Sequence, residues 1–287
     1  QYKCTANSSM YRNYKFIFAC GLVSCLCCGK ATGDLAEDSM NPLGTVISLP
    51  FENNTLFNLG PSNSTANVLN IKPIFPVYAG NWNLINRLIV PVVYAQGQDE
   101  IIDDDFSWGS GNPGSFGIGS AFGLGDTTYQ GFITPKKSGK VAWGLGGSIV
   151  IPTHTKDRFG SNKWSAGPAL VAFAPLDNWV LGGILQNIWS VAGDDDAADV
   201  NVFSAQLTVN YKLKNRWYLT TSPLITANWE APKENRWTVP LGGGIGRIFK
   251  LQKKAIAVDV GAYYNVESPR FANDWYTQIL LNFLFPK

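Results

Sequence analysis

The sequence predicts an all-β protein, a closed antiparallel transmembrane β-barrel of about twelve strands. Three observations predict this fold class. Long segments alternate apolar and polar residues with a period of two, which is the period of a β-strand. Short and long connections alternate between these segments, and tryptophan recurs at the segment ends. Transmembrane barrels combine these features, because one face of each strand contacts lipid and the other faces a lumen.

The composition fits a membrane protein that crosses the bilayer with strands. Hydrophobic residues make up 45% of the 287 residues and charged residues only 15%, against roughly 25% charged residues in an ordinary soluble domain. No apolar run reaches the roughly 18 to 20 residues that a membrane-spanning helix needs. The formal net charge is only +2, which argues against a nucleic-acid-binding protein that works through bulk electrostatic attraction.

Residues 1–31 are predicted to be an N-terminal extension and a signal peptide, which leaves residues 32–287 for the barrel. Arg12 and Lys15 precede an apolar stretch, and small residues follow it. This is the layout of a secretory signal peptide. Met10 is the expected start of translation.

All five cysteines lie in this N-terminal part, at Cys4, Cys20, Cys25, Cys27 and Cys28. Their spacing lacks the second half-site of a metal centre, and the chain has one histidine, so no metal site is expected. The residues "LVSC", which end at Cys25, fit the cleavage box of a bacterial lipoprotein. Lipidation of Cys25 therefore remains open.

The remaining chain divides into about twelve predicted strands. They comprise residues 46–59, 68–78, 82–94, 125–134, 141–152, 164–174, 179–191, 200–213, 217–229, 237–251, 255–266 and 275–285. Each is long enough to cross a bilayer, which takes about 9 to 11 residues of tilted strand. Strands of soluble proteins are shorter and average about 5 to 6 residues.

The connections between these segments differ in length in a regular way. Short ones are predicted at residues 79–81, 136–140, 175–178, 214–216 and 252–254. Long ones are predicted at residues 60–67, 96–124, 153–163, 192–199, 230–236 and 267–274. Short periplasmic turns and longer outer loops are typical of outer-membrane barrels. The pattern therefore places both chain termini on the periplasmic side.

Tryptophan marks the ends of many predicted strands. The predicted aromatic girdle consists of Trp82, Trp164, Trp179, Trp189, Trp217, Trp229, Trp237 and Trp275. An indole ring favours the membrane–water interface, because its body is apolar and its N–H needs a partner. Tryptophans packed into a soluble β core are the alternative, and the repeated placement at strand ends favours the girdle.

The glycine-rich stretch "RWTVPLGGGIGRIFKL" raises the question of a phosphate-binding loop. A dinucleotide-binding loop needs the pattern G-x-G-x-x-G between a strand and a helix. Here Arg247 occupies the place of the last glycine, and no helical pattern follows. Read with a period of two, Gly242, Gly244 and Gly246 fall on the inner face of a strand. The absent side chains either leave space in the lumen or let another group approach the wall.

Several segments resemble a known family. They are "LNIKPIFPVY", "WNLINRLIVPVV", "QNIWSVAGD", "QLTVNY", "WTVPLGGGIGRIFK" and "LLNFLFPK". They resemble bacterial outer-membrane barrels that are described as transporters, similar to those of the phenol-degradation meta-pathway and often labelled "neuromedin U". The resemblance covers residues 46–287. It implies an uptake channel for small, hydrophobic or aromatic compounds, and it carries no catalytic residues.

The resemblance also implies a location and a set of partners. The location is the outer membrane of a Gram-negative bacterium. The expected partners are outer-membrane lipid and lipopolysaccharide, the barrel assembly machinery and a small-molecule solute. No nucleic acid and no cofactor are expected.

Strand alternation predicts which polar side chains face the lumen. The predicted lumen-lining residues are Lys72, Arg87, Asp126, Gln130, Gln206, Asp259, Tyr263 and Gln278. The basic residues are expected to point inward, because a charge on the lipid face near mid-membrane costs about 2 to 4 kcal/mol. Two roles remain open for Lys72 and Arg87. They line a constriction that favours anions, or Asp126 and Asp259 neutralise them and they only fill the barrel.

A barrel-embedded lipase or lipid-modifying enzyme is an alternative to a channel. Such a hydrolase needs a histidine, a serine nucleophile and an orienting group. His154 is the only histidine, and Ser161 and Asn162 lie near it in the sequence, but not with the spacing of outer-membrane phospholipase. The favoured interpretation is that His154 is a solvated loop residue and that the protein is not an enzyme. A structural or adhesive surface barrel is the second alternative.

Two acidic runs, 99–105 and 194–196, lie in predicted outer loops. Their carboxylates could bind a divalent cation, including one that bridges lipopolysaccharide. A solvated acidic loop is the favoured interpretation, so no metal-binding residue is predicted.

Overall fold

The structure, a computed structural model, describes residues 46–97, 119–251 and 254–285. These residues belong to one compact unit, Gly33–Pro286. The predicted signal peptide with Met10, the cysteines with Cys25, and the acidic run 99–105 lie outside the described residues.

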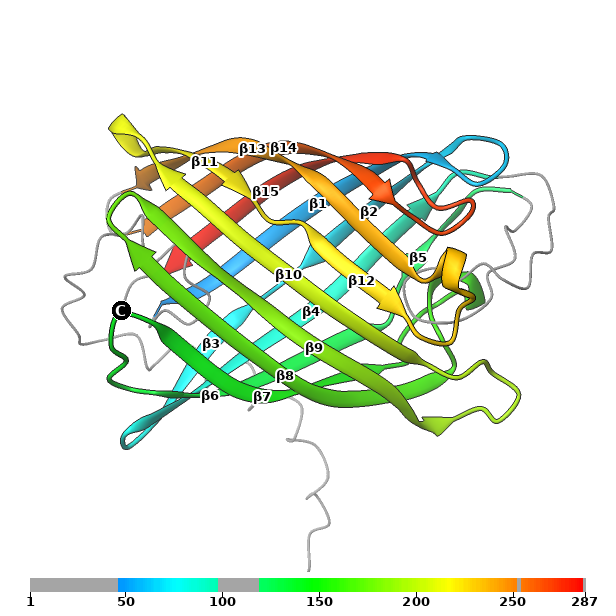
Figure 1. Cartoon of the computed structure of the whole chain (residues 1–287), viewed down its shortest axis with the longest axis horizontal. Helices are drawn as coiled ribbons and strands as arrows, with labels where there is room; N and C mark the ends of the chain where they lie inside the picture. The colour runs from blue at the N-terminus through cyan, green and yellow to red at the C-terminus, as the bar shows by residue number, and fades with distance from the viewer. Residues whose placement is uncertain (1–45, 98–118, 252–253, 286–287) are drawn as a thin grey trace, which may run out of the picture. The chain divides into compact units, whose positions relative to one another are not determined.

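The described residues form fifteen strand segments of one antiparallel sheet. The segments are β1 (Ile47–Leu59), β2 (Ser64–Ile71), β3 (Ile74–Ala79), β4 (Trp82–Ala95), β5 (Ala121–Leu124), β6 (Thr127–Pro135), β7 (Ala142–Ile151), β8 (Lys163–Leu176), β9 (Trp179–Gly193), β10 (Asn201–Lys212), β11 (Trp217–Thr221), β12 (Leu224–Asn228), β13 (Trp237–Leu251), β14 (Lys254–Glu267) and β15 (Trp275–Phe285). The first segment pairs with the last, and β9 pairs with β10, so the sheet closes on itself (Figure 1). Closure leaves no strand edge with unsatisfied backbone groups facing lipid.

Three strands are interrupted, so the fifteen segments build a twelve-stranded barrel. The halves of the interrupted strands are β2 and β3, β5 and β6, and β11 and β12. A proline, which has no N–H for the ladder, lies in or opposite each break. The carbonyl oxygens of Pro73, Pro91 and Pro223 still accept hydrogen bonds from Leu88 N, Gly125 N and Leu207 N, respectively. The predicted fold class is therefore confirmed.

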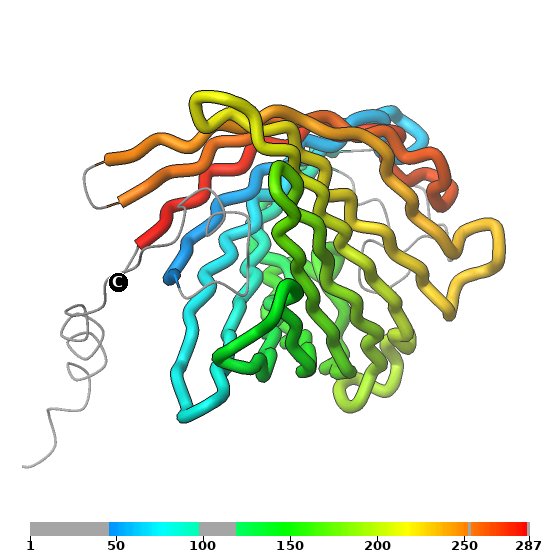
Figure 2. The backbone as a smooth tube through the Cα atoms, turned by 60° about the vertical axis from the view of Figure 1, so that its left-hand side comes forward, coloured from blue at the N-terminus to red at the C-terminus, as the bar shows by residue number. Residues whose placement is uncertain are grey.

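The two ends of the barrel differ in their connections (Figure 1, Figure 2). The turn end holds the connections 80–81, 136–141 and 177–178, together with the start of β1 and the end of β15. It also holds the short helix η2 (Lys214–Arg216). The opposite, loop end holds the helices η1 (Asp157–Phe159) and η3 (Lys233–Asn235). Among the described residues, no helix has the length and hydropathy that a membrane span requires.

The strict alternation of short and long connections is wrong at one place. The connection predicted as 60–67 spans only residues 60–63, because β2 begins at Ser64, which pairs with Leu59. It is therefore shorter than the turn-end connection 136–141. Polar residues at the start of β2 resemble a loop in sequence, but their backbone continues the ladder. The strand predicted at 125–134 also begins earlier, with β5, which pairs with the end of β4.

The inner and outer faces of the wall differ in character. Leu145, Leu241 and Val260 point outward and are 57%, 58% and 53% exposed, as expected for contact with lipid. Inside the barrel, an apolar cluster packs toward the turn end. Its members are Val46, Ile74, Ile85, Phe132, Ala169, Val171, Phe173, Val180, Ile184, Tyr218, Ile248, Ala255, Ala257 and Leu284. Buried polar residues such as Ser48, Asn210 and Asn282 lie in the same half, so the turn-end interior is mixed in character.

Candidate functional site: a polar network and a cavity inside the barrel

Polar side chains meet inside the barrel near the middle of the strands. Glu52 comes from β1, Arg87 from β4 and Gln206 from β10. Each occupies an inward position, because alternate residues of a strand point to opposite faces. Arg87 also lies directly opposite Gln130 in the register of β4 and β6. The alternation and register of the strands thus bring these groups to one level of the interior.

Hydrogen bonds between these side chains cross the lumen. Arg87 Nη1 donates to Gln130 Oε1 over 3.0 Å, and Arg87 Nη2 donates to Gln206 Oε1 over 3.3 Å. Gln130 Nε2 in turn donates to Gln186 Oε1 over 2.6 Å, and Ser148 Oγ donates to the same oxygen. In the wall, β6, β7, β8 and β9 lie between β4 and β10. The hydrogen bond from Arg87 to Gln206 therefore joins strands that are not neighbours. We call these five residues the cross-lumen network.

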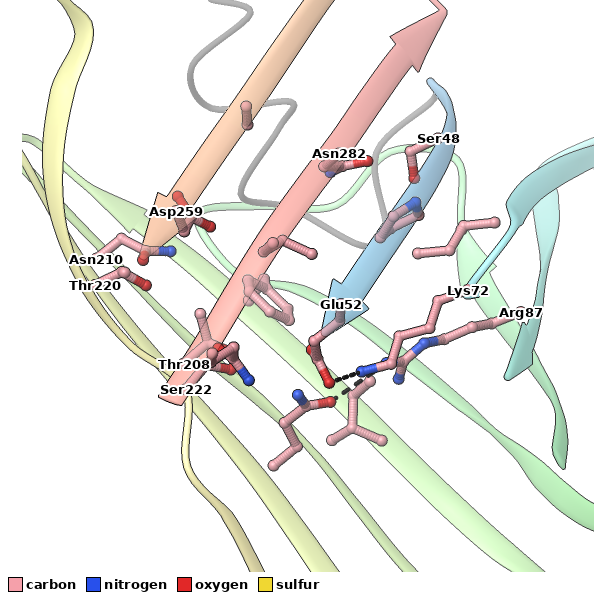
Figure 3. A pocket seen from close by; sticks show the side chains of 18 of the residues that line it. Ser48, Glu52, Lys72, Arg87, Thr208, Asn210, Thr220, Ser222, Asp259 and Asn282 are labelled. Atoms are coloured by element: carbon pink, nitrogen blue, oxygen red, sulfur yellow. Dashed lines mark hydrogen bonds and ion pairs between the residues drawn. The ribbon is translucent and has the colours of Figure 1, made fainter. Parts of the chain in front are cut away.

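An ion pair lies beside the network. Lys72 Nζ lies 2.6 Å from Glu52 Oε1, and both side chains are almost fully buried. Asn54 and Asn70 also donate hydrogen bonds to the same carboxylate oxygen. Figure 3 shows Lys72 and Arg87 next to one another, with Glu52 facing both. One carboxylate therefore serves two neighbouring cations.

Arg87 has only neutral hydrogen-bond partners. Its side chain belongs to a residue that is 8% exposed, and none of the ion pairs among the described residues includes it. A guanidinium has five N–H donors, and Arg87 uses two of them for glutamine oxygens. Its Nε is buried without a hydrogen-bond partner in the part of the chain that the structure describes. Arg87 is thus a buried cation with spare donors.

A cavity of about 150 Å³ adjoins the network on its turn-end side. The polar part of its wall includes Glu52, Lys72, Arg87, Gln206, Asp259 and Gln278. The apolar part includes Val46, Ile74, Phe173, Ile184, Ala257 and Leu280. Ser48 and Asn282, near the turn end, also line it (Figure 3). Polar and apolar side chains therefore share the wall, and Arg87 and Lys72 give it two buried cations.

Gly246 shapes the wall of this cavity. Tyr218 Oη donates a hydrogen bond to Asp259 Oδ1, and a Cβ atom at position 246 would collide with both side chains. At Gly242 and Gly244, a Cβ would collide with the backbone of β14. Of the two interpretations of these glycines, the structure supports close approach of other groups to the wall.

The structure places the eight predicted lumen-lining residues at four locations. Lys72, Arg87, Gln206, Asp259 and Gln278 line the cavity. Gln130 belongs to the cross-lumen network. Tyr263 is buried inside the barrel, where its hydroxyl accepts a hydrogen bond from Ser222 N and its ring stacks on Tyr276. Asp126 lies at the break between β5 and β6, away from the cavity wall.

Sequence reasoning missed three members of the ion pair and the cross-lumen network. Glu52, Ser148 and Gln186 were not among the predicted residues, although Glu52 is the partner of Lys72 and Gln186 extends the network. Alternation could have found Glu52, because Ser48 and Pro50 precede it on the same face of β1. The alternation of apolar and polar residues indicated Gln186 less clearly, because Gly182 and Gly183 interrupt it in β9.

His154 is buried, which corrects its interpretation as a solvated loop residue. Its side chain is 7% exposed, and its Nδ1 lies 2.6 Å from Asp126 Oδ1. Asp126 also accepts hydrogen bonds from His154 N and Ser161 N. Ser161 Oγ donates to Lys163 O instead of to the histidine. The carboxylate thus fastens the connection between β7 and β8 to the barrel wall.

The described acidic run contacts its own loop and the neighbouring connection between β7 and β8. Asp196 N donates to Asp194 Oδ1, and Asp194 N donates to Asn162 O. Within the described residues, no group of three or more His, Cys, Asp or Glu side chains could hold a metal ion.

The predicted girdle residues lie at the two ends of the strands. At the turn end are Trp82, Trp179 and Trp217, and at the loop end are Trp164, Trp189, Trp229, Trp237 and Trp275. Seven of them are exposed, while Trp237 is partly covered by Trp229 and Phe203. Trp143, which the prediction omitted, is also exposed.

Comparisons with known proteins found a matching family model and structures of similar fold. A model described as "Putative MetA-pathway of phenol degradation" matches residues 60–274. The structure is similar to an outer membrane channel from Pseudomonas putida F1, with 15% identity, a TM-score of 0.59, and coverage of 90% of this chain and 99% of that chain. It is also similar to outer membrane phospholipase A from Escherichia coli, with 13% identity, a TM-score of 0.41, and coverage of 84% and 92%. At 15% identity, the likeness to the Pseudomonas channel shows the fold alone. No curated protein matches the sequence.

Proposed function

The chain belongs to the family described as "Putative MetA-pathway of phenol degradation", and we propose that it is a channel for small hydrophobic or aromatic solutes. The protein is a β-barrel of the outer membrane of a Gram-negative bacterium, with a closed wall and an apolar outer face. The family description refers to phenol degradation, which supports an aromatic solute. Outer-membrane lipid surrounds the wall, and lipopolysaccharide and the barrel assembly machinery are the further partners that we propose.

The observation that carries this proposal is the cavity beside the cross-lumen network. Ligand sites combine mostly apolar walls with a few polar groups that fix the orientation of the ligand. The cavity has Phe173 and Ile184 on one part of its wall and Arg87 on another. A solute with an apolar body and one polar group can contact both parts at once.

The cross-lumen network supports a gate made of side chains. The contact between Arg87 Nη2 and Gln206 Oε1 is long, at 3.3 Å, and joins strands that are not neighbours in the wall. Rotation of either side chain breaks it without disturbing a backbone hydrogen bond. We therefore propose that passage of a solute requires this contact to open while the barrel keeps its shape.

Planar-bilayer recordings of the refolded barrel test the proposal. The native protein should give a small single-channel conductance, and Gln206→Ala should raise it at least twofold, because the link across the lumen is lost. Gln278→Ala is the matched control: Gln278 lines the same cavity, but it bonds to Asn54 on the adjacent strand β1. A barrel without conductance in both the native form and Gln206→Ala would contradict the channel proposal.

The buried pair of His154 and Asp126 gives the enzyme alternative its strongest support. A histidine oriented by a carboxylate is two-thirds of a hydrolase triad, but the described contacts join Ser161 Oγ to Lys163 O. We therefore infer a structural role for the pair. His154→Ala should leave the turnover of phospholipid by the purified barrel unchanged. A native barrel that hydrolyses phospholipid, and loses this activity in His154→Ala, would favour the enzyme.

A further inference from the structure

Among the described residues, two buried cations, Lys72 and Arg87, lie beside one carboxylate, Glu52. Lys72 and Arg87 are 7% and 8% exposed, and Glu52 is the carboxylate that faces both (Figure 3). Glu52 forms its ion pair with Lys72. The other carboxylate of the cavity, Asp259, lies on β14 and accepts the Tyr218 hydroxyl. In Figure 3, Asp259 and Arg87 lie on opposite sides of Glu52.

A buried charge without a paired counter-charge is unfavourable, since desolvation is not offset by an ion pair. Arg87 has two glutamine oxygens as partners, which leaves three of its five N–H donors without an acceptor among the described residues. One of the three is the buried Nε–H. A guanidinium binds a carboxylate through two parallel N–H···O bonds. The unused donors of Arg87 therefore match a carboxylate in chemistry.

The space next to Arg87 limits the size of such a ligand. The cavity measures about 150 Å³, and an apolar protein cavity of roughly 150 Å³ is large enough to bind benzene. Ile74, which lies opposite Arg87 in the register of β3 and β4, and Phe173 and Ile184 contribute apolar side chains to the wall. The volume thus suits one six-membered ring, and the apolar side chains of the wall offer contacts for it.

We propose that this cavity binds a small monocarboxylate whose body is about one aromatic ring, with the carboxylate on Arg87 and the ring against Phe173 and Ile184. The proposal rests on the proposed function and narrows its solute to an organic anion. The ligand supplies the missing counter-charge and competes with Gln206 for Arg87. Binding of the transported anion would thereby loosen the contact that closes the lumen.

Isothermal titration of the full-length barrel in detergent with benzoate tests the site, and benzyl alcohol serves as a neutral probe of similar size. Benzoate should bind the native barrel at least tenfold more tightly than benzyl alcohol. Arg87→Gln should weaken benzoate binding by about ten- to a hundredfold, as expected for hydrogen bonds to a charged group, and should leave benzyl alcohol nearly unaffected. Arg247→Gln is the control, because Arg247 packs over Trp217 and Phe249 on the outer face. It should bind benzoate as the native barrel does.

A second variant keeps the test decisive if Arg87→Gln does not fold. Glu52→Gln removes the carboxylate that serves both cations, so benzoate should bind at least about threefold more tightly. Equal affinity for benzoate and benzyl alcohol in the native barrel, or unchanged or weaker benzoate binding in Glu52→Gln, would overturn the site. A barrel that conducts but does not bind benzoate overturns this inference and leaves the channel intact. A barrel that binds benzoate but passes no solute contradicts the channel alone.

Discussion

Single residues decide how much of the barrel interior is filled. Gly246 lies where Tyr218 and Asp259 approach β13, and even one added carbon atom would collide with both. Arg87 has the opposite effect, because its side chain reaches across the lumen to Gln206 on a distant strand. Strand alternation indicated the inward direction of these residues. It could not indicate the contacts, since these depend on side chains of strands far apart in the sequence.

Gly246→Ala should destabilise the barrel by about 1–3 kcal/mol, which is typical of overpacking in a filled interior. The added methyl group displaces Tyr218 or Asp259 and breaks the hydrogen bond between them. Urea unfolding of the barrel in lipid vesicles measures this change. Gly139→Ala is the control, because the structure has open space around Gly139. Equal stability of the two variants would show that the Tyr218–Asp259 contact does not depend on Gly246.

At the scale of elements, the predicted strands and the observed ones agree best where polar and apolar residues alternate cleanly, as in β10 and β14. The breaks were missed, because a proline such as Pro73 or Pro223 interrupts the ladder without changing the alternation. The start of β2 was missed because Ser64 and Thr65 are polar in a strand. The buried position of His154 also could not be predicted from the sequence, because its partner Asp126 is 28 residues away.

Asp126 fastens the connection between β7 and β8, so Asp126→Ala should loosen it. The substitution removes the acceptor of His154 N and Ser161 N and the partner of the His154 ring, and each buried donor left without an acceptor costs about 1–3 kcal/mol. Trypsin should then cleave at Lys156 or Arg158 at least several-fold faster, while the barrel stays folded. Asp195→Ala, in an exposed part of another loop, is the control. Unchanged cleavage in Asp126→Ala would refute the anchoring role.

The whole molecule presents two ends of different character to the two sides of the membrane. The turn end holds the short turns, the start of β1 and the end of β15. The loop end holds most of the longer loops. We predict that the turn end faces the periplasm. Cysteines introduced at Asn178, in the β8–β9 turn, and at Asp195, in the β9–β10 loop, lie at opposite ends. In intact cells, a membrane-impermeant maleimide should label only position 195; labelling of position 178 from outside would reverse or refute this topology.

The proposed channel requires that Arg87 lies in the path of the solute. The most direct measurement is the reversal potential of single barrels in a planar bilayer under a salt gradient. Arg87→Glu should shift the reversal potential toward cation selectivity, because charged side chains at a constriction set the selectivity of a pore. Lys136→Glu, an equal change of charge at an exposed turn-end position, should shift it much less. An unchanged reversal potential in an Arg87→Glu barrel that still conducts would contradict the account.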